Sequence, residues 1–133
     1  MTPSIAGGPR VLVVDDEPTI CRALSIALRR AGYEARSAET VDAAQSLLQT
    51  QHFDAMIVDL HIPDQRGDIL FEVAAALQPH LRTATLFTTG DTSDRALELI
   101  AACRTPYLVK PFDLAELTGY MDRFTRRAQD VSA

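Results

Sequence analysis

Residues 11–17 read Val-Leu-Val-Val-Asp-Asp-Glu, a run of four apolar residues that passes directly into three acidic ones. The apolar run is too short for a helix and has no alternating polar residue, so it predicts a strand buried on both faces of a sheet. Pro18 follows the acidic residues, and proline is favoured in the first turn of a helix. The stretch therefore predicts a buried strand, an acidic turn and a helix in immediate succession.

The same alternation of strand and helix continues along the rest of the chain. Apolar runs predict further strands buried on both faces at 55–58, 86–88 and 107–109, and the polar alternation of 33–38 predicts an edge strand. Apolar residues spaced by three or four positions predict five helices, within 20–31, 41–48, 70–77, 96–101 and 114–124. We expect Gly32 to end the first helix and Thr40 to cap the second. This alternation predicts an α/β fold, in which helices cover both faces of a parallel sheet.

The composition fits one globular domain. The chain has 133 residues, of which 47% are hydrophobic, and its 18 acidic and 13 basic side chains give a net charge of −5. The acidic balance argues against nucleic acid or a membrane as partner, because both favour basic surfaces. Without a membrane-spanning run or a signal-peptide core, we expect a cytoplasmic location. We predict a flexible lead at 1–9, rich in Gly and Pro, one domain at 10–128 and a tail at 129–133.

Two groups of residues have a structural rather than a functional interpretation. We expect Cys21 and Cys103 to be small buried apolar residues. Two cysteines are too few for a disulfide framework, and these two lack the spacing of metal ligands. We expect Arg123, Arg126 and Arg127 to complement the negative end of the last helix.

Polar residues follow four of the five predicted strands. In open parallel sheets, ligands bind beyond the carboxyl ends of the strands. The residues there are Asp15-Asp16-Glu17, Asp59, Thr89-Gly90-Asp91 and Lys110-Pro111. Each group alone has an ordinary explanation as a turn residue, a helix cap or a solvated side chain. Turn chemistry does not explain why all four fall at one end of the sheet, so we interpret them as a site.

The chemistry of this set indicates a metal ion beside a phosphoryl group. Clustered carboxylates repel one another, and Mg²⁺, which prefers carboxylates, waters and phosphate oxygens, relieves that repulsion. Lys110 supplies a positive charge suited to a phosphoryl oxygen, and Thr89 supplies a hydroxyl donor. The chain lacks a phosphate-cradling Gly-rich loop. We therefore expect a covalently attached phosphoryl group rather than a nucleotide.

These motifs resemble the receiver domain of two-component response regulators. The resemblance rests on Val-Leu-Val-Val-Asp-Asp-Glu (11–17), Val-Asp-Leu-His-Ile-Pro-Asp (58–64) with Gly67, Phe-Thr-Thr-Gly-Asp (87–91) and Tyr-Leu-Val-Lys-Pro-Phe (107–112). It covers about residues 10–127. It implies a flavodoxin-like (βα)₅ fold, with a doubly wound, parallel, five-stranded sheet in the order 2-1-3-4-5.

The resemblance also implies a role for each residue of the site. Asp59 would be the phosphoacceptor, and Lys110 and the hydroxyl of Thr89 would contact the phosphoryl group. Mg²⁺ would be bound directly by Asp16, largely through water by Asp15, and also by Asp59 and the backbone carbonyl of His61. The Lys110–Pro111 peptide bond would be cis.

A signalling function follows from the same resemblance. The domain would take a phosphoryl group from a histidine kinase or a histidine phosphotransfer domain, and it would catalyse only its own phosphotransfer and autodephosphorylation. Thr89 and Tyr107 would then switch a protein-binding face formed by the helix at 96–101, the strand at 107–109 and the helix at 114–124. A downstream target protein would bind that face, and a homodimer of unspecified mode could form.

One segment departs from the family pattern. Cys103-Arg104-Thr105-Pro106 stands where receivers usually carry a Gly-Ala-type turn, which leaves the shape of the output face open. The run Arg-Thr-Pro-Tyr-Leu-Val-Lys-Pro-Phe (104–112) and the Thr-Gly-Asp end of the fourth strand (89–91) resemble receivers attached to hybrid histidine kinases. A stand-alone receiver and a hybrid-kinase receiver both remain open.

Other functions fit the sequence less well. A phosphatase of the haloacid-dehalogenase type needs a second Asp two residues after its nucleophile, where this chain has His61. A flavin carrier needs a hydroxyl- and Gly-rich loop after the first strand, where Asp-Asp-Glu would repel the phosphate. A degenerate receiver, which binds partners without phosphorylation, remains the alternative. By resemblance, His61 and Asp91 flank the opening to the acceptor, where their side chains could pair.

Overall fold

The computed structural model describes the backbone of residues 8–132 and the side chains up to Arg126, so residues 1–7 of the predicted lead and Ala133 lie outside it. Its centre is a parallel sheet of five strands with the order β2-β1-β3-β6-β7. The strands are β1 (Arg10–Val14), β2 (Glu34–Ala38), β3 (Ala55–Asp59), β6 (Thr85–Thr89) and β7 (Tyr107–Val109). The predicted fold class and strand order are confirmed, since β6 and β7 are the fourth and fifth strands of this sheet.

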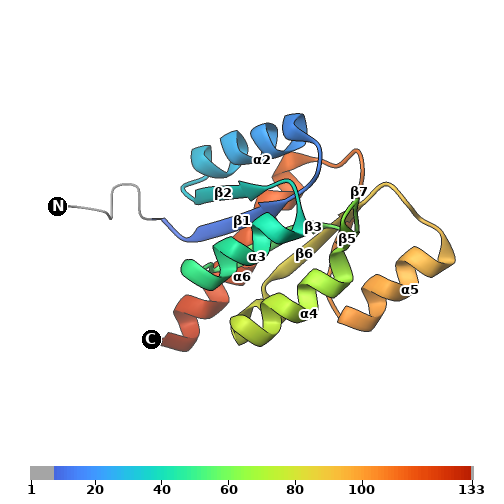
Figure 1. The fold of residues 1–133 in the computed structure, drawn as a ribbon. Coiled ribbons are helices and arrows are strands. Elements are labelled where there is room, and N and C mark those ends of the chain that lie inside the picture. The colour runs from blue at the N-terminus through green and yellow to red at the C-terminus, as the bar shows by residue number, and fades with distance from the viewer. Residues whose placement is uncertain (1–7, 133) are drawn as a thin grey trace.

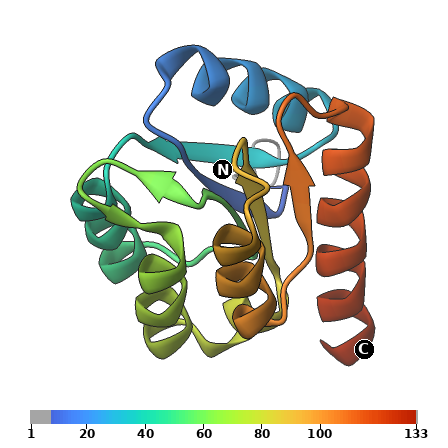
Figure 2. The same ribbon diagram turned by 90° about the vertical axis from the view of Figure 1, so that its right-hand side faces the viewer.

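Helices cover both faces of the sheet (Figures 1 and 2). They are α2 (Pro18–Arg30), α3 (Val41–Thr50), α4 (Gly67–Leu77), α5 (Asp94–Cys103) and α6 (Leu114–Ser132), with a short 3-10 helix, η1 (Pro79–Thr83), after α4. The helices α2 and α6 pack on one face, and α3, α4 and α5 pack on the other. None of the described helices combines the length and apolarity needed to cross a bilayer.

The strand β1 is buried on both of its faces, which explains its continuous apolar sequence. Leu12 and Val14 point into the core under α3, α4 and α5, whereas Val11 and Val13 point into the core under α2 and α6. Because successive side chains of a strand alternate between the faces of the sheet, a strand between two helical layers needs apolar residues at every position.

The helix boundaries follow the predicted local chemistry. Pro18 begins α2, and Gly32 follows that helix with a φ of 97°, a conformation that suits glycine. The side chain of Thr40 accepts a hydrogen bond from the backbone N–H of Ala43 at the start of α3. Both cysteines are buried, as predicted.

Two predictions about the C-terminal half are wrong. The strand β7 is not buried on both faces: it lies at the sheet edge, with Tyr107 39% and Val109 40% exposed. The helix α6 continues to Ser132, through the predicted tail, and has no basic residue in its last turn. Arg123 therefore does not complement the helix end but lies over the ring of Tyr120, at 4.4 Å.

A short hairpin was not predicted. It follows β3 and consists of β4 (His61–Ile62) and β5 (Gln65–Arg66), which pair in antiparallel fashion. Its strands are too short to show a period of two. A carboxylate of the hairpin, Asp64, accepts hydrogen bonds from the backbone N–H of Val41, at 3.0 and 3.1 Å, and so joins the hairpin to the start of α3.

Candidate functional site

Three predicted site residues meet where β1 and β3 end. Asp15 follows β1, Asp16 comes next, and Asp59 is the last residue of β3. One carboxylate oxygen from each lies within 4.8 Å of the other two. Asp15 and Asp59 are only 2% and 6% exposed, so water screens their repulsion poorly.

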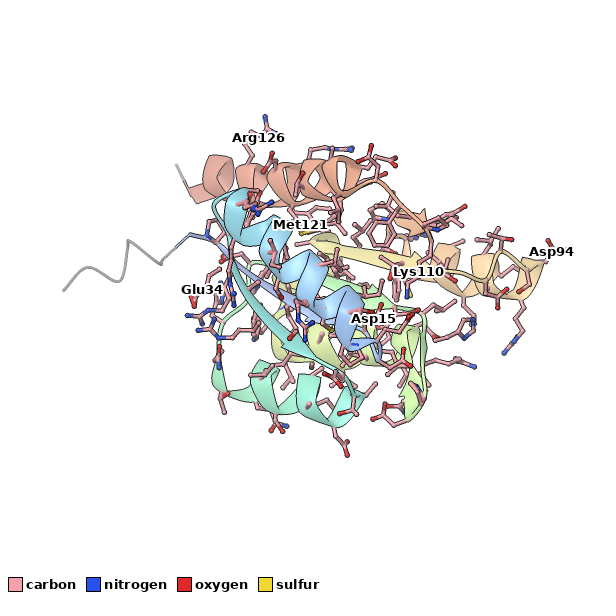
Figure 3. All side chains as sticks on the ribbon, turned by 90° about the horizontal axis from the view of Figure 1, so that it is seen from above. Asp15, Glu34, Asp94, Lys110, Met121 and Arg126 are labelled. Carbon is pink, nitrogen blue, oxygen red and sulfur yellow. The ribbon has the colours of Figure 1, made fainter. Side chains whose placement is uncertain are left out.

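Lys110, which follows β7, holds the two buried carboxylates together. Its Nζ lies 2.8 Å from Oδ2 of Asp59 and 2.9 Å from Oδ2 of Asp15, and Glu17 lies farther away, at 3.5 Å. In Figure 3, Lys110 and Asp15 lie side by side at this end of the sheet. Burial opposes the charge of Lys110, but the hydrogen bonds to Asp59 and Asp15 outweigh it and hold the pKa of the ammonium above its usual value.

Asp59 uses both of its carboxylate oxygens. Oδ2 accepts from Lys110, and Oδ1 accepts from the backbone N–H of His61 at 3.1 Å. Burial raises the pKa of Asp59, and these two donors offset only part of that rise. The site therefore keeps a desolvated carboxylate beside one strong cation, which is a suitable setting for a nucleophile that attacks an electrophilic phosphorus.

Gly67 fixes the backbone behind Asp59. A Cβ at this position would lie 2.3 Å from the carbonyl oxygen of Asp59, so α4 can begin this close to β3 only with glycine. The N–H of Gly67 also donates to the carbonyl of Leu60, at 2.7 Å. Asp64, whose bonds to α3 steady the adjoining hairpin, is a contributor that the sequence did not reveal.

Among the described residues, the hydrogen bonds of the predicted switch residues do not reach the carboxylates. The hydroxyl of Thr89 donates to the carbonyl of Asp91 at 3.0 Å and accepts from its N–H at 2.9 Å. Tyr107 lies on the exposed edge strand β7. In this conformation the Thr89 hydroxyl is therefore bound to the loop after β6, and Tyr107 is accessible at the edge of the sheet.

Two further expectations are confirmed. His61 and Asp91 pair, with Nε2 of the imidazole 2.9 Å from Oδ2 of the carboxylate. The peptide bond between Lys110 and Pro111 is cis.

The oxygen donors of the site fit a hard divalent cation. Asp15, Asp16 and Asp59 offer three carboxylates within reach of one ion, and Mg²⁺ typically takes one or two carboxylates and completes its shell with waters and phosphate oxygens. Lys110 pairs with Asp15 and Asp59. Its single positive charge is smaller than the combined negative charge of the three carboxylates, which leaves negative charge for a cation to neutralise.

Comparisons with known proteins agree with this geometry. The sequence model of the response regulator receiver domain matches residues 11–122. The response regulator protein PilR of Pseudomonas aeruginosa is 34% identical over 108 residues, which cover 81% of this chain and 24% of PilR. Across the similar curated proteins, the chain spans about half of their length or less.

Solved structures extend the likeness to three dimensions. A CheY-like receiver domain protein from Methanospirillum hungatei has a TM-score of 0.85 at 23% identity, with 93% of this chain and 98% of that one covered. A response regulator from Burkholderia pseudomallei, solved with a phosphorylated aspartic acid, a calcium ion and citrate, has a TM-score of 0.77 at 28% identity, with 94% of this chain and 73% of that one covered. The chain belongs to the response regulator receiver domain family of two-component signalling.

Proposed function

We propose that this domain accepts a phosphoryl group on Asp59 from a phosphohistidine donor and thereby switches a protein-binding face. The observation that carries the proposal is the setting of Asp59, a buried carboxylate bound to Lys110 and to the backbone N–H of His61 beside two further acids. A phosphorylated aspartic acid in the related Burkholderia pseudomallei regulator supports the same chemistry here.

The transfer needs little covalent chemistry from the protein. A carboxylate oxygen of Asp59 forms a bond to phosphorus, the bond between phosphorus and the histidine nitrogen breaks, and that nitrogen keeps the electron pair. Lys110 counters the negative charge on the phosphoryl oxygens, because its ammonium already lies 2.8 Å from Asp59. Positioning and charge neutralisation account for most of the rate in such transfers.

A bound Mg²⁺ would neutralise further charge on the phosphoryl oxygens. Asp15, Asp16 and Asp59 would hold it, with the backbone carbonyl of His61 as a fourth protein ligand. The related Burkholderia pseudomallei regulator was solved with a calcium ion, which supports the binding of a divalent cation by this domain. Asp15 has a second task, since it also accepts from Lys110 and from the backbone N–H of Glu17.

Phosphorylation would change the partners of Thr89. Its hydroxyl is bound to Asp91 in the present conformation, and a phosphoryl oxygen on Asp59 would compete for it. Movement of Thr89 would then draw Tyr107 inward from the edge of the sheet. Only the switched conformation satisfies Thr89 and Lys110 against the phosphoryl group, so phosphorylation shifts an existing equilibrium.

The donor protein would dock beside Lys110. A groove of about 460 Å³ opens there between α2 and the start of α6, and its apolar walls include Ile20, Leu24, Phe112 and Leu114. Lys110 and Glu17 line both this groove and the carboxylate site, so the groove is continuous with the site. A histidine kinase or phosphotransfer domain that brings its phosphohistidine to Asp59 must cover this neighbourhood.

The remaining assignments rest on family membership. The output would pass through the face formed by α5, β7 and α6, to a downstream target or to a second copy of the chain. The location would be cytoplasmic, where kinases of this class present their phosphohistidine. The domain acts on its own side chain and has no other substrate.

Phosphorylation by acetyl phosphate in the presence of Mg²⁺ tests the proposal. Intact-mass measurement should show one added phosphoryl group that hydroxylamine removes, and none in Asp59→Asn. Asp42→Asn, which changes an exposed carboxyl on α3, is the control and should be labelled like wild type. An unmodified wild type would favour the degenerate receiver, and full labelling of Asp59→Asn would move the acceptor to another residue.

A further inference from the structure

A second cavity lies at the opposite end of the sheet from Asp59. It has a volume of about 340 Å³ and opens between η1, the start of β6, the turn before β7 and the middle of α6. Figure 2 shows β7 entering the sheet at this end, next to the C-terminal half of α6. The lining residues that matter here are Arg82, Arg104, Thr105, Tyr120, Arg123 and Phe124.

The lining is basic in a chain that carries a net charge of −5. It contains three arginines and no acidic residue. Arg82 pairs with Glu72 at 3.0 Å, and both side chains are exposed. Within the described part of the chain, no carboxylate lies within 4.0 Å of the guanidinium groups of Arg104 and Arg123.

Arg104 adopts a conformation that usually belongs to glycine. It ends α5 with φ 57° and ψ 40°, and it is the one described residue other than glycine with a positive φ. A left-handed backbone is unfavourable for a residue with a Cβ, and glycine is the common choice where a helix ends this way. A strained residue that persists at such a turn favours a functional role for its side chain.

Thr105 adds an unused polar group. Its Oγ1 is buried and has no hydrogen-bond partner among the described residues, although Thr105 lines the cavity. Buried hydroxyls are normally satisfied. A ligand oxygen in the cavity would supply the missing partner.

We propose that this cavity binds a small organic phosphate, meaning a phosphate ester of a planar apolar group. A guanidinium group can donate two parallel hydrogen bonds to two oxygens of one phosphate. Arg104 and Arg123, which pair with no described carboxylate, together match the double negative charge of a phosphate monoester. The rings of Tyr120 and Phe124, with centroids 6.3 Å apart, line the cavity, and Arg123 lies over the Tyr120 ring at 4.4 Å, so a planar group would pack beside this stack. The volume falls within the range of small-molecule pockets, roughly 300–1,000 Å³.

Phenyl phosphate is the probe, titrated into the ¹⁵N-labelled protein without Mg²⁺ and followed by NMR. We expect saturable shifts at the amides of Arg104, Thr105 and Tyr120, with weaker binding of inorganic phosphate. Arg104→Gly should weaken binding at least tenfold while the melting temperature rises, because glycine relieves the left-handed strain. Arg22→Ala, which removes the same charge from an exposed position on α2, should bind like wild type.

Several results would overturn the proposal. They are the absence of saturable shifts, equal weakening by Arg104→Gly and Arg22→Ala, and inorganic phosphate that binds as tightly as phenyl phosphate. An acidic peptide that shifts the same amides where phenyl phosphate does not would assign the cavity to a protein partner instead. Phenyl phosphate binding separates the two roles of Arg104, since a purely structural role predicts a higher melting temperature for Arg104→Gly with phenyl phosphate binding unchanged.

Discussion

The imidazole of His61 and the carboxylate of Asp91, 30 positions apart in sequence, meet with Nε2 and Oδ2 separated by 2.9 Å. The pair bridges the segment after β3 and the loop after β6, which carry the neighbours of Asp59 and Thr89. Both side chains are exposed, by 52% and 39%, so the pair contributes little to stability. Its position between the two loops points to an effect on access to Asp59.

Loss of this pair should shorten the lifetime of the phosphorylated protein. Asp91→Asn removes the charge opposite His61 but leaves an oxygen for the backbone N–H of Ser93, which Asp91 binds at 2.9 Å. We expect faster hydrolysis at Asp59 and a change in unfolding free energy below about 1 kcal/mol, as is usual for exposed pairs. Phosphate release after removal of the donor measures the rate. Asp94→Asn is the control, and equal decay of all three proteins would contradict a role for the pair.

Removal of Asp16 should weaken Mg²⁺ binding more than removal of Asp15. Asp16 has the metal as its proposed partner, whereas Asp15 also accepts from Lys110 and from the N–H of Glu17. Mg²⁺ titration followed by tyrosine fluorescence gives both affinities. The metal assignment of Asp16 fails if Asp16→Ala binds Mg²⁺ as tightly as wild type does.

Asp59→Asn should stabilise the metal-free protein near neutral pH. Because burial raises the pKa of Asp59 in the folded state, ionisation of this carboxyl costs folding free energy. The cost is absent below the ordinary carboxyl pKa of ~3.9 and grows as the pH rises through the folded pKa. Thermal unfolding at pH 7 should therefore give a higher melting temperature for Asp59→Asn, with a smaller difference at pH 3.5. A lower melting temperature at pH 7 would show that the bond to Lys110 outweighs the burial.

Thr89→Ala should separate phosphorylation from switching. The variant keeps Asp59 and Lys110, so acetyl phosphate should still label it, but it lacks the hydroxyl that couples the loop after β6 to the phosphoryl group. Phosphorylation-dependent NMR shifts around Tyr107 should be reduced. Thr92→Ala, on the same loop and exposed, serves as the control. Undiminished shifts at Tyr107 in Thr89→Ala would contradict the coupling.

Two glycine substitutions should have opposite effects on stability. In Gly67→Ala, the new Cβ would meet the carbonyl oxygen of Asp59 at 2.3 Å, so we expect a loss of about 1–3 kcal/mol and weaker labelling of Asp59. In Gly119→Ala, the new Cβ would meet nothing within 4 Å beyond the adjoining turns of its own helix, and the residue is inside α6, so we expect a gain of about 0.5–1 kcal/mol. Denaturant unfolding measures both, and a neutral Gly67→Ala would show that α4 can shift.

Sequence patterns predicted the parts of the fold that depend on local periodicity. The apolar run of β1 has no polar alternation because both of its faces are covered, and that is visible in four residues. The run of β7 is equally apolar, yet Tyr107 and Val109 are exposed, because β7 lies at the edge of the sheet. Periodicity reports the character of a strand but does not show whether a helix covers it.

The contacts within the site join residues that are distant in sequence, so local sequence patterns could not predict all of them. The carboxyl ends of parallel strands meet at one edge, and this rule brought Asp15, Asp59 and Lys110 together in advance. The simultaneous bonds of Lys110 to both carboxylates and the bond of Asp64 to α3, 23 positions away, emerge only from the folded chain. The sequence showed that the turn at Arg104 departs from the receiver family pattern, but it did not predict the left-handed backbone of Arg104.

The parallel sheet also makes the domain electrically polar along its strands. Every strand of the five-stranded sheet runs the same way, so acids that follow its strands collect at one end, where Asp15, Asp16 and Asp59 lie. Arg82, Arg104 and Arg123 line the cavity at the other end. A charged partner approaching from solution would therefore meet clustered carboxylates at one end of the strands and arginines at the other. The common direction of the strands thus determines which end of the domain holds the reactive carboxylate and which kind of charge a partner meets there.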